Sequence, residues 1–288
     1  RQQKPSSYFP SSMDLQDALK GRSYHAPDRF HNNSRYLYYV SGWDDPRMPT
    51  ICGIRRRGYT PESIRLFAEK VGVAKRDNVI DLSLLEWCLR EDLNKRANRY
   101  MTVLNPVKLV ITNWEDGKVE YFDAPLNPEN PDGPKRKVAF TKELYIERED
   151  FMEDAPKKYF RLKPDGEVRL KYSYIIKCEE VIKDEDGNVI EIRCTYDPTS
   201  KPGAGPWRSV KGTIHWVSIE HSKEIEVRVF DRLFTEPYMG SIPEGEDYKN
   251  YLNPNSLDVK TGYAEEDLLK DSFEIGVQFE RTGYFAKD

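Results

Sequence analysis

The sequence of 288 residues has little net charge and no long apolar run. Its 45 basic and 49 acidic side chains give a net charge of −4, so no overall field attracts a polyanion, and any nucleic-acid role must come from local clusters. No segment approaches the roughly 20 apolar residues of a membrane-spanning helix, and the start lacks the apolar core of a signal peptide. No membrane partner is therefore expected, whereas the net charge neither indicates nor excludes a nucleic-acid role. We also expect a cytoplasmic monomer without a DNA partner.

Motifs that carry chemistry are also scarce. The cysteines show no paired spacing that would bind zinc, and the histidines lie in no metal or nucleophile motif. No Gly-rich phosphate loop follows a strand. Asp44 and Asp45, beside Pro46, are interpreted as turn caps rather than an acid–base pair, and His215 as a core or sheet-face residue. The residues alone predict no catalytic residue, no metal site and no cofactor in this chain.

The pattern of apolar and polar residues changes along the chain. Residues 1–41 show no helical or strand period, and we expect an irregular or unrelated N-terminal segment there. Thr60, followed by Pro61 and an acid, predicts a helix that begins at 61 and is ended by Gly72. Ser83, with Glu86 three residues on, predicts a capping box and a second helix that ends near 97. Residues 42–105 are therefore predicted to be a small helical segment.

From residue 106 to 288 the apolar period changes to two, with short runs separated by Pro, Gly, Asn and Asp. This pattern predicts a mainly β fold with two antiparallel β-barrels, because open sheets would leave pairing edges exposed. The clearest hairpin is predicted from 168 to 196 around Asp186. Such a hairpin would bring Cys178 opposite Cys194, which we interpret as two buried thiols rather than a disulfide.

A basic cluster lies in residues 155–172. Six basic side chains and two acidic ones give a local charge of +4, which is typical of a phosphate-binding surface. On an extended strand Arg169, Lys171 and Ser173 would share one face. Nearby Tyr159 and Phe160 offer flat surfaces for unpaired bases, which favours single-stranded RNA loops. The alternative is a solvated strand face with core aromatics.

Several segments, taken in their order along the chain, resemble glutaminyl-tRNA synthetases. They are WDDPRMPT at 43–50, RRRGYT at 55–60, PVKLVI at 106–111, YD at 196–197, VKGTIHWVS at 210–218 and DRLF at 231–234. The resemblance runs from about Val40 to Asp288. It implies the C-terminal half of that enzyme, in which a helical connector from the end of the catalytic domain precedes two β-barrels that bind the anticodon loop of glutamine tRNA.

The resemblance also implies individual roles for residues of this chain. Arg99 and Gln278 match readers of the middle anticodon base, Arg161 a reader of the third base, and Arg169 a residue that holds the first. Arginine offers planar, fixed-charge donors, and a glutamine amide can donate and accept on a base edge. Further members of the implied anticodon surface are Lys158, Phe160, Lys171 and Arg281. Lys158 and Phe160 depart from the bacterial pattern of glutamine and lysine, so Phe160 is expected to stack rather than pair.

Weaker tRNA-backbone contacts are implied for a second group of basic residues: Arg55, Arg56, Arg57, Lys75 and Arg76. For the three consecutive arginines, ion pairs that hold the joint to the catalytic domain remain an alternative to phosphate contacts.

The family's HIGH and KMSKS-like signatures, which hold ATP, do not occur in residues 1–41. We therefore expect this chain alone to be inactive as a ligase, although the intact enzyme would use ATP and magnesium. Two alternatives stay open: a free-standing RNA-binding or interaction module on the same barrels without ligase activity, or descent from a glutamyl enzyme.

Overall fold

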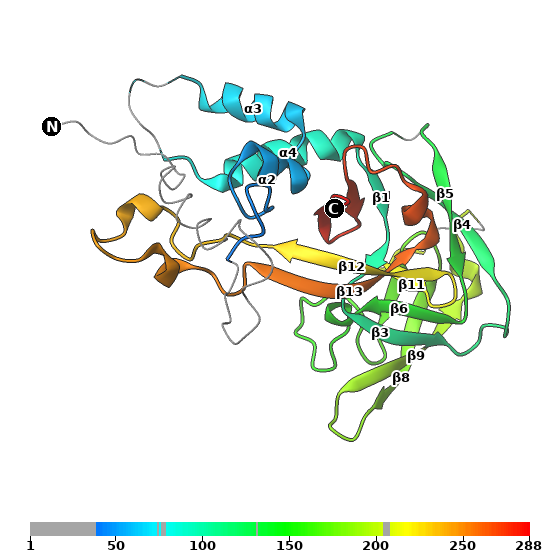
Figure 1. Cartoon of the computed structure of the whole chain (residues 1–288). Helices are drawn as coiled ribbons and strands as arrows, with labels where there is room; N and C mark the ends of the chain where they lie inside the picture. Colours follow the sequence, from blue (N-terminus) through cyan, green and yellow to red (C-terminus); the bar gives the residue numbers. More distant parts are fainter. Residues whose placement is uncertain (1–38, 74, 76–78, 131, 204–207) are drawn as a thin grey trace, which may run out of the picture. The chain divides into compact units, whose positions relative to one another are not determined.

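The computed structural model describes residues 39–73, 75, 79–130, 132–203 and 208–288. These residues form two compact units. Unit 1 contains the described residues up to Asn94, together with 228–258 and 286–288, and unit 2 contains 95–227 and 259–285. Segments far apart in the sequence therefore contribute to each unit (Figure 1).

Unit 1 contains the helices α2 (Ile51–Arg56), α3 (Pro61–Val71) and most of α4 (Leu82–Arg96). The predicted start of α3 is confirmed, because the Thr60 hydroxyl accepts the Ser63 N–H at 3.2 Å. Its predicted end at Gly72 is also confirmed, with a φ of 66° that glycine adopts at little cost.

The predicted capping box of α4 is wrong. Ser83 lies inside the helix, and the side chain that caps the first turn is Asp81, whose Oδ1 accepts the Ser83 N–H at 2.8 Å. Hydrogen bonds from the Ser83 hydroxyl and from its N–H lower the pKa of Asp81. Because the helix already begins at Leu82, Ser83 lies within the first turn, and Asp81 rather than Ser83 occupies the N-cap position.

Unit 2 is built on a seven-stranded sheet in the order β10, β7, β8, β9, β3, β6, β11. The strands are β3 (Pro106–Ile111), β6 (Glu143–Glu147), β7 (Glu167–Leu170), β8 (Ile175–Lys183), β9 (Val189–Asp197), β10 (Thr213–Ile214) and β11 (Trp216–Ser218). The two outermost strands, β10 and β11, are separated in sequence by His215 alone, so the sheet nearly closes into a barrel (Figure 1). The mainly β prediction is confirmed.

The barrel is not entirely antiparallel. β3 pairs with β9, and β7 with β10, in parallel. Its core contains Trp114, Phe140, Leu162, Ile176 and Trp216, all buried. The two-stranded sheet β4 (Glu120–Pro125) and β5 (Lys135–Phe140) contributes Phe122 and Phe140 to this core.

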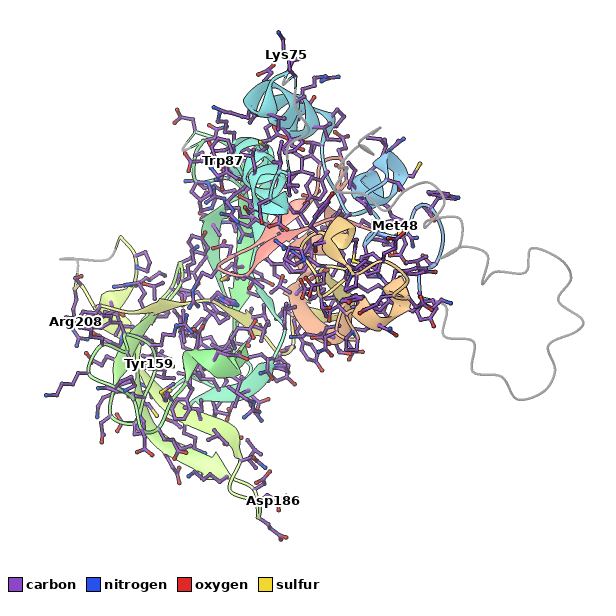
Figure 2. All side chains as sticks on the ribbon, turned by 90° about the vertical axis from the view of Figure 1, so that its left-hand side faces the viewer. Met48, Lys75, Trp87, Tyr159, Asp186 and Arg208 are labelled. Carbon is purple, nitrogen blue, oxygen red and sulfur yellow. The ribbon has the colours of Figure 1, made fainter. Side chains whose placement is uncertain are left out.

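The predicted hairpin is shorter than expected. It consists of β8 and β9, with Asp186 at its tip (Figure 2), whereas Val168 belongs to the separate strand β7. Tyr172, at a φ of 65°, turns the chain between β7 and β8. Cys178 does lie opposite Cys194, and both are buried free thiols.

The second β region of unit 2 has its own core. One three-stranded sheet contains β12 (Ser222–Phe230), β13 (Leu257–Glu265) and β2 (Thr102–Val103), and another contains β1 (Asn98–Tyr100), β14 (Val277–Phe279) and β15 (Gly283–Phe285). Tyr100, Val227, Leu268, Val277 and Phe279 pack together between them. β12 and β13 extend past the boundary of unit 2 into the residues of unit 1.

Short 3₁₀ helices complete the described chain. They are η2 (Arg148–Asp150), η3 (Pro198–Ser200), η4 (Met239–Ser241), η5 (Tyr248–Tyr251) and η6 (Glu266–Lys270).

A buried ionic network ties β5 to the second β region. The Arg136 guanidinium donates to Glu265 at 2.8 Å and to Glu280 at 3.0 Å, and all three side chains are almost fully buried. Burial alone would lower the pKa of Arg136, but the two carboxylates raise it. The charges thus stabilise one another where water cannot.

Replacing Arg136 with Met should lower the free energy of unfolding of unit 2 by about 3 to 5 kcal/mol, because two buried carboxylates lose their shared counter-charge. Urea unfolding followed by far-ultraviolet circular dichroism measures this change. Lys137→Met, at the neighbouring exposed position that pairs with Asp123, is the control and should change little. Equal effects of the two substitutions would contradict the prediction.

Candidate nucleic-acid interface

Arg99 and Gln278, both predicted to read the middle base, are cross-strand neighbours. β1 and β14 pair in parallel with Arg99 opposite Gln278, so their side chains leave the same face of the sheet. The Arg99 guanidinium is mostly buried and lies 3.8 Å from the Glu129 carboxylate. Two residues 179 positions apart in the sequence are therefore brought together by strand register.

Arg161 and Arg281 converge on one buried carboxylate. Arg281 donates from both terminal nitrogens to the two oxygens of Asp150, at 2.5 and 2.7 Å, and Nε of Arg161 lies 3.2 Å from Oδ1 of the same residue. The Arg161 Nη1 also donates to the Glu149 carbonyl at 3.0 Å. Asp150 is only 1 % exposed, whereas the Arg161 side chain is 45 % exposed.

His215 extends this cluster into the barrel. Its Nδ1 lies 3.0 Å from Nη1 of Arg281, and because arginine can only donate, Nδ1 must accept and the ring proton sits on Nε2. Nε2 is 3.6 Å from Glu147, which accepts the backbone N–H groups of Leu104 and Asn105. The predicted core role of His215 is confirmed, since the residue is buried.

Lys171 pairs with the other buried carboxylate of this region. Its ammonium contacts Glu280, which also accepts the Tyr172 hydroxyl at 2.8 Å and is part of the Arg136 network. Burial alone would raise the pKa of Glu280, but Lys171 and Arg136 lower it below its usual value. Lys171 is thus placed by Glu280 rather than free in solvent.

Lys158 and Phe160 are exposed on the segment before β7. The ammonium of Lys211 lies 5.4 Å from the centre of the Phe160 ring. A Cβ at Gly212 would lie 1.9 Å from the Phe160 carbonyl oxygen, so only glycine permits this close approach. An exposed aromatic ring beside a cation is a surface on which an unpaired base can stack.

Arg169 does not share an exposed face with Lys171, contrary to the alternation that we expected. It is buried, and its guanidinium donates to the carbonyls of Ser173, Ser200 and Arg208 at 2.8 to 3.0 Å. Burial lowers its pKa. Arg169 lies on the face of β7 opposite the core residues Val168 and Leu170, and the segments that carry Ser173, Ser200 and Arg208 cover this face and bury its guanidinium.

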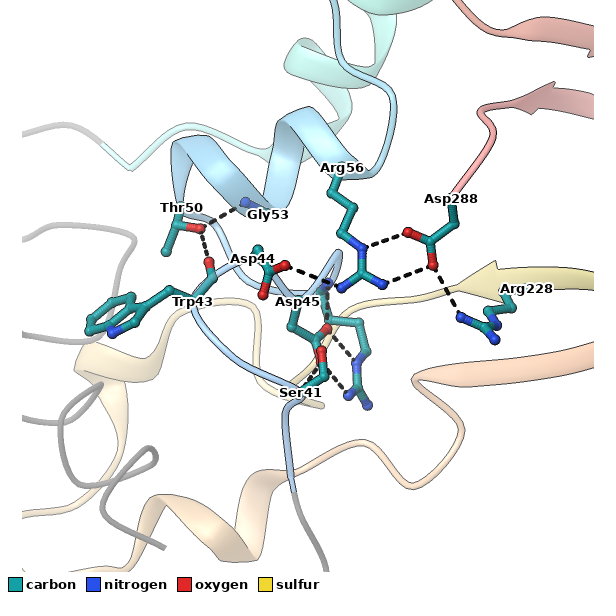
Figure 3. Close-up of polar contacts among 10 residues, drawn as sticks. Ser41, Trp43, Asp44, Asp45, Thr50, Gly53, Arg56, Arg228 and Asp288 are labelled. Carbon is teal, nitrogen blue, oxygen red and sulfur yellow. Dashed lines mark hydrogen bonds and ion pairs between the residues drawn. The ribbon is translucent and has the colours of Figure 1, made fainter. Parts of the chain in front are cut away.

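The three consecutive arginines of unit 1 have different surroundings. Arg56 donates to both carboxylate oxygens of Asp288, at 2.6 and 2.9 Å (Figure 3). Arg57 donates to the Phe230 carbonyl at 3.0 Å. Arg55 is exposed. Ion pairing is therefore observed for Arg56, and Arg55 has the solvent access that a phosphate contact requires.

Of the other weaker candidates, Lys75 follows α3 and lies at an end of the helical segment (Figure 2). Arg76 is outside the described residues.

Asp45 organises the turn before α2, as the sequence predicts. Its carboxylate accepts the N–H groups of Ser41 and Arg47 at 2.7 and 2.9 Å and the Arg47 guanidinium at 2.8 Å (Figure 3). Burial alone would raise the pKa of Asp45, but the hydrogen bonds from Arg47 and Ser41 lower it to about 2. A Cβ at Gly53 would lie 2.5 Å from the Asp45 carbonyl oxygen, which fixes how closely α2 packs on this turn.

Sequence reasoning missed two carboxylates, Asp150 and Glu280, which pair with basic residues of the predicted anticodon surface. Their partners Arg281 and Lys171 lie 131 and 109 positions away, so no local pattern marks them. Within the described ranges no group of three or more metal-ligating side chains occurs, and the search of these residues finds no helix that could span a membrane.

Comparisons with known proteins identify the domains to which stretches of this chain are similar. The anticodon-binding domain of class I tRNA synthetases (E and Q) matches in two parts, residues 97–197 and 213–288, and the catalytic domain of the same class matches residues 29–95. The chain belongs to this synthetase family. Its matched parts include nearly all of unit 2.

The similar curated proteins are glutamine–tRNA ligases. Those of Nitrosomonas europaea, Clostridium kluyveri and Rhodopirellula baltica are 52 %, 50 % and 51 % identical over 251, 253 and 251 residues. The matches cover 86–87 % of this chain but only 42–45 % of the relatives. The chain thus corresponds to the C-terminal region of a glutaminyl-tRNA synthetase and spans less than half of such ligases.

The catalytic-domain match adds to the sequence analysis. It begins at residue 29, inside the segment that we expected to be irregular or unrelated. A fragment of the synthetase's catalytic domain therefore precedes the anticodon-binding domains, and it includes the turn held by Asp45 and the helices α2 and α3.

The Asp45 carboxyl should titrate with a midpoint near pH 2 rather than near its usual 3.8. Since its folded pKa is depressed, the stability that it contributes, about 2 kcal/mol, is present above pH 4 and lost as the pH falls toward 2. Carbon-13 chemical shifts of the aspartate carboxyls measure this midpoint. A midpoint close to 4 would contradict the hydrogen-bonding account, and Asp45→Asn should remove this part of the pH dependence.

Proposed function

We propose that unit 2 binds the anticodon loop of glutamine tRNA, as part of the enzyme that joins glutamine to that tRNA. The observation that carries the proposal is the match of residues 97–197 and 213–288 to the anticodon-binding domains of the family. The identity of about 50 % to glutamine–tRNA ligases supports glutamine tRNA as the partner.

The groups of the proposed surface have the chemistry that unpaired bases require. Arg99 and Gln278, side by side on β1 and β14, offer charged donors and an amide to the Watson–Crick edge of a middle base. Arg161 presents a guanidinium to the third base. Phe160, with Lys211 beside its ring, offers a stacking surface.

The remaining basic residues serve this surface in other ways. Lys171 and Arg281, each paired with a buried carboxylate, add positive potential for the phosphates. Arg169 acts on the first-base region indirectly, by holding the loop backbones at Ser173, Ser200 and Arg208. In unit 1 Arg55 and Lys75 contribute contacts to the phosphate backbone of the tRNA.

The whole enzyme's activity is proposed for the longer protein to which this region corresponds. That enzyme would activate glutamine with ATP and magnesium in the cytoplasm, and the present residues would select the tRNA. A free-standing binding module on the same domains would share the RNA-binding properties tested below but would not require a ligase.

The chain should bind glutamine tRNA more tightly than a transcript with a changed anticodon, and its affinity should fall steeply with salt, because phosphate neutralisation releases counterions. Arg161→Ala should weaken binding by about 1 to 3 kcal/mol. Filter binding or fluorescence anisotropy at several salt concentrations measures both effects.

Arg193→Ala on β9 is the matched control. Its side chain is 44 % exposed and paired with Glu180 and Glu191, so it resembles Arg161 in exposure and pairing but lies outside the proposed surface. The proposal would fail if the chain bound both transcripts equally, or if the two arginine substitutions had the same effect.

A further inference from the structure

We propose that Asp150 is a positioning residue for anticodon recognition, which sets the direction of the Arg161 guanidinium through a cluster shared with Arg281. This inference rests on the proposed function. Asp150 lies at the end of η2, and its carboxylate is the one acidic group to which both arginines converge.

The geometry divides the roles of the two arginines. Arg281 places both terminal nitrogens on Asp150 and one of them also on His215, so this guanidinium is turned toward the protein. Arg161 contacts Asp150 only through Nε and the Glu149 carbonyl through Nη1. Among the described residues no group hydrogen-bonds to Nη2 of Arg161. Arg281 therefore holds Asp150 in place, and Arg161 directs N–H donors of its guanidinium away from the protein.

The backbone around Asp150 is fixed by the segment that carries Arg161. The Leu162 N–H donates to the Asp150 carbonyl at 3.0 Å, and the Met152 N–H donates to the Leu162 carbonyl at 3.1 Å. Leu162 is fully buried in the barrel core. The backbones that carry the carboxylate and the arginine are thus held in register by the same short bridge.

The charge balance makes the role testable. Asp150, Arg161 and Arg281 together carry a charge of +1, so removal of the carboxylate raises the local charge to +2. Two unbraced guanidiniums attract any phosphate more strongly, but they no longer present a fixed edge to one base. Loss of positioning should therefore lower specificity while general affinity for RNA rises. A residue with only a structural role would not lower the specificity while it raises the general affinity for RNA.

The experiment compares an RNA stem-loop that has the glutamine tRNA anticodon with one changed at the third base. In Asp150→Asn the ratio of the two dissociation constants should fall by roughly 5-fold to 100-fold, the loss expected for one base contact. The dissociation constant for the changed stem-loop should stay the same or decrease, and its salt dependence should steepen by about one unit. Circular dichroism reports whether the variant is folded.

Glu149→Gln is the matched control, because it makes the same change in net charge at the adjacent exposed position, where the backbone carbonyl rather than the carboxylate holds Arg161. It should keep the specificity ratio. Should Asp150→Asn not fold, Arg281→Lys decides, since lysine keeps the charge but cannot clamp both oxygens of Asp150. It too should lower the ratio.

The two proposals fail in different ways. If the unaltered chain does not distinguish the stem-loops, the anticodon-binding function is wrong, and the positioning role falls with it. If the unaltered chain distinguishes them and Arg161→Ala abolishes the difference, a folded Asp150→Asn chain with an unchanged ratio overturns the positioning role alone.

Discussion

The positions of several basic side chains in unit 2 depend on two buried carboxylates. Glu280 holds Lys171, Tyr172 and Arg136, and Asp150 holds Arg281 and approaches Arg161. Each acid is desolvated at a cost that only close, well-directed cations can offset. The cations are consequently fixed in direction as well as in charge. For the proposed reading of bases, fixed direction matters more than net charge, and the chain as a whole is slightly acidic.

The barrel gives these groups a stiff frame. Its outermost strands β10 and β11 are joined through His215, and this residue also contacts Arg281. The point at which the sheet closes is therefore also a member of the polar cluster. Because Trp216 and Ile214 on either side of His215 are fully buried, the histidine has little freedom to move away from the arginine that it accepts from.

Local patterns in the sequence predict much of this fold. Thr60 and Gly72 bound α3 because capping depends on neighbours in the chain, and the apolar period of two identifies the β region. Ser83 misled because two candidate caps, Asp81 and Ser83, stand two residues apart. Arg169 misled because segments distant in the sequence, at Ser200 and Arg208, cover its face of the strand and bury it.

The candidate site was predictable only in part. Similarity to a family indicates which residues to inspect, and strand register then brings Arg99 to Gln278. The roles of Asp150 and Glu280 could not be predicted, because they arise from contacts across more than a hundred residues of sequence.

Tyr172 and Arg281 share a feature with a consequence for how this region can evolve. Both have a positive φ, 65° and 67°, a conformation in which a glycine would relieve backbone strain. Both also supply a side chain that a buried acid requires. Glycine at either position would relax the backbone but remove one of the donors to a buried carboxylate, the Tyr172 hydroxyl at Glu280 or the Arg281 guanidinium at Asp150. If this region reads tRNA as proposed, a substitution that relaxes the backbone at either position would do so at the expense of the contacts that direct the basic side chains.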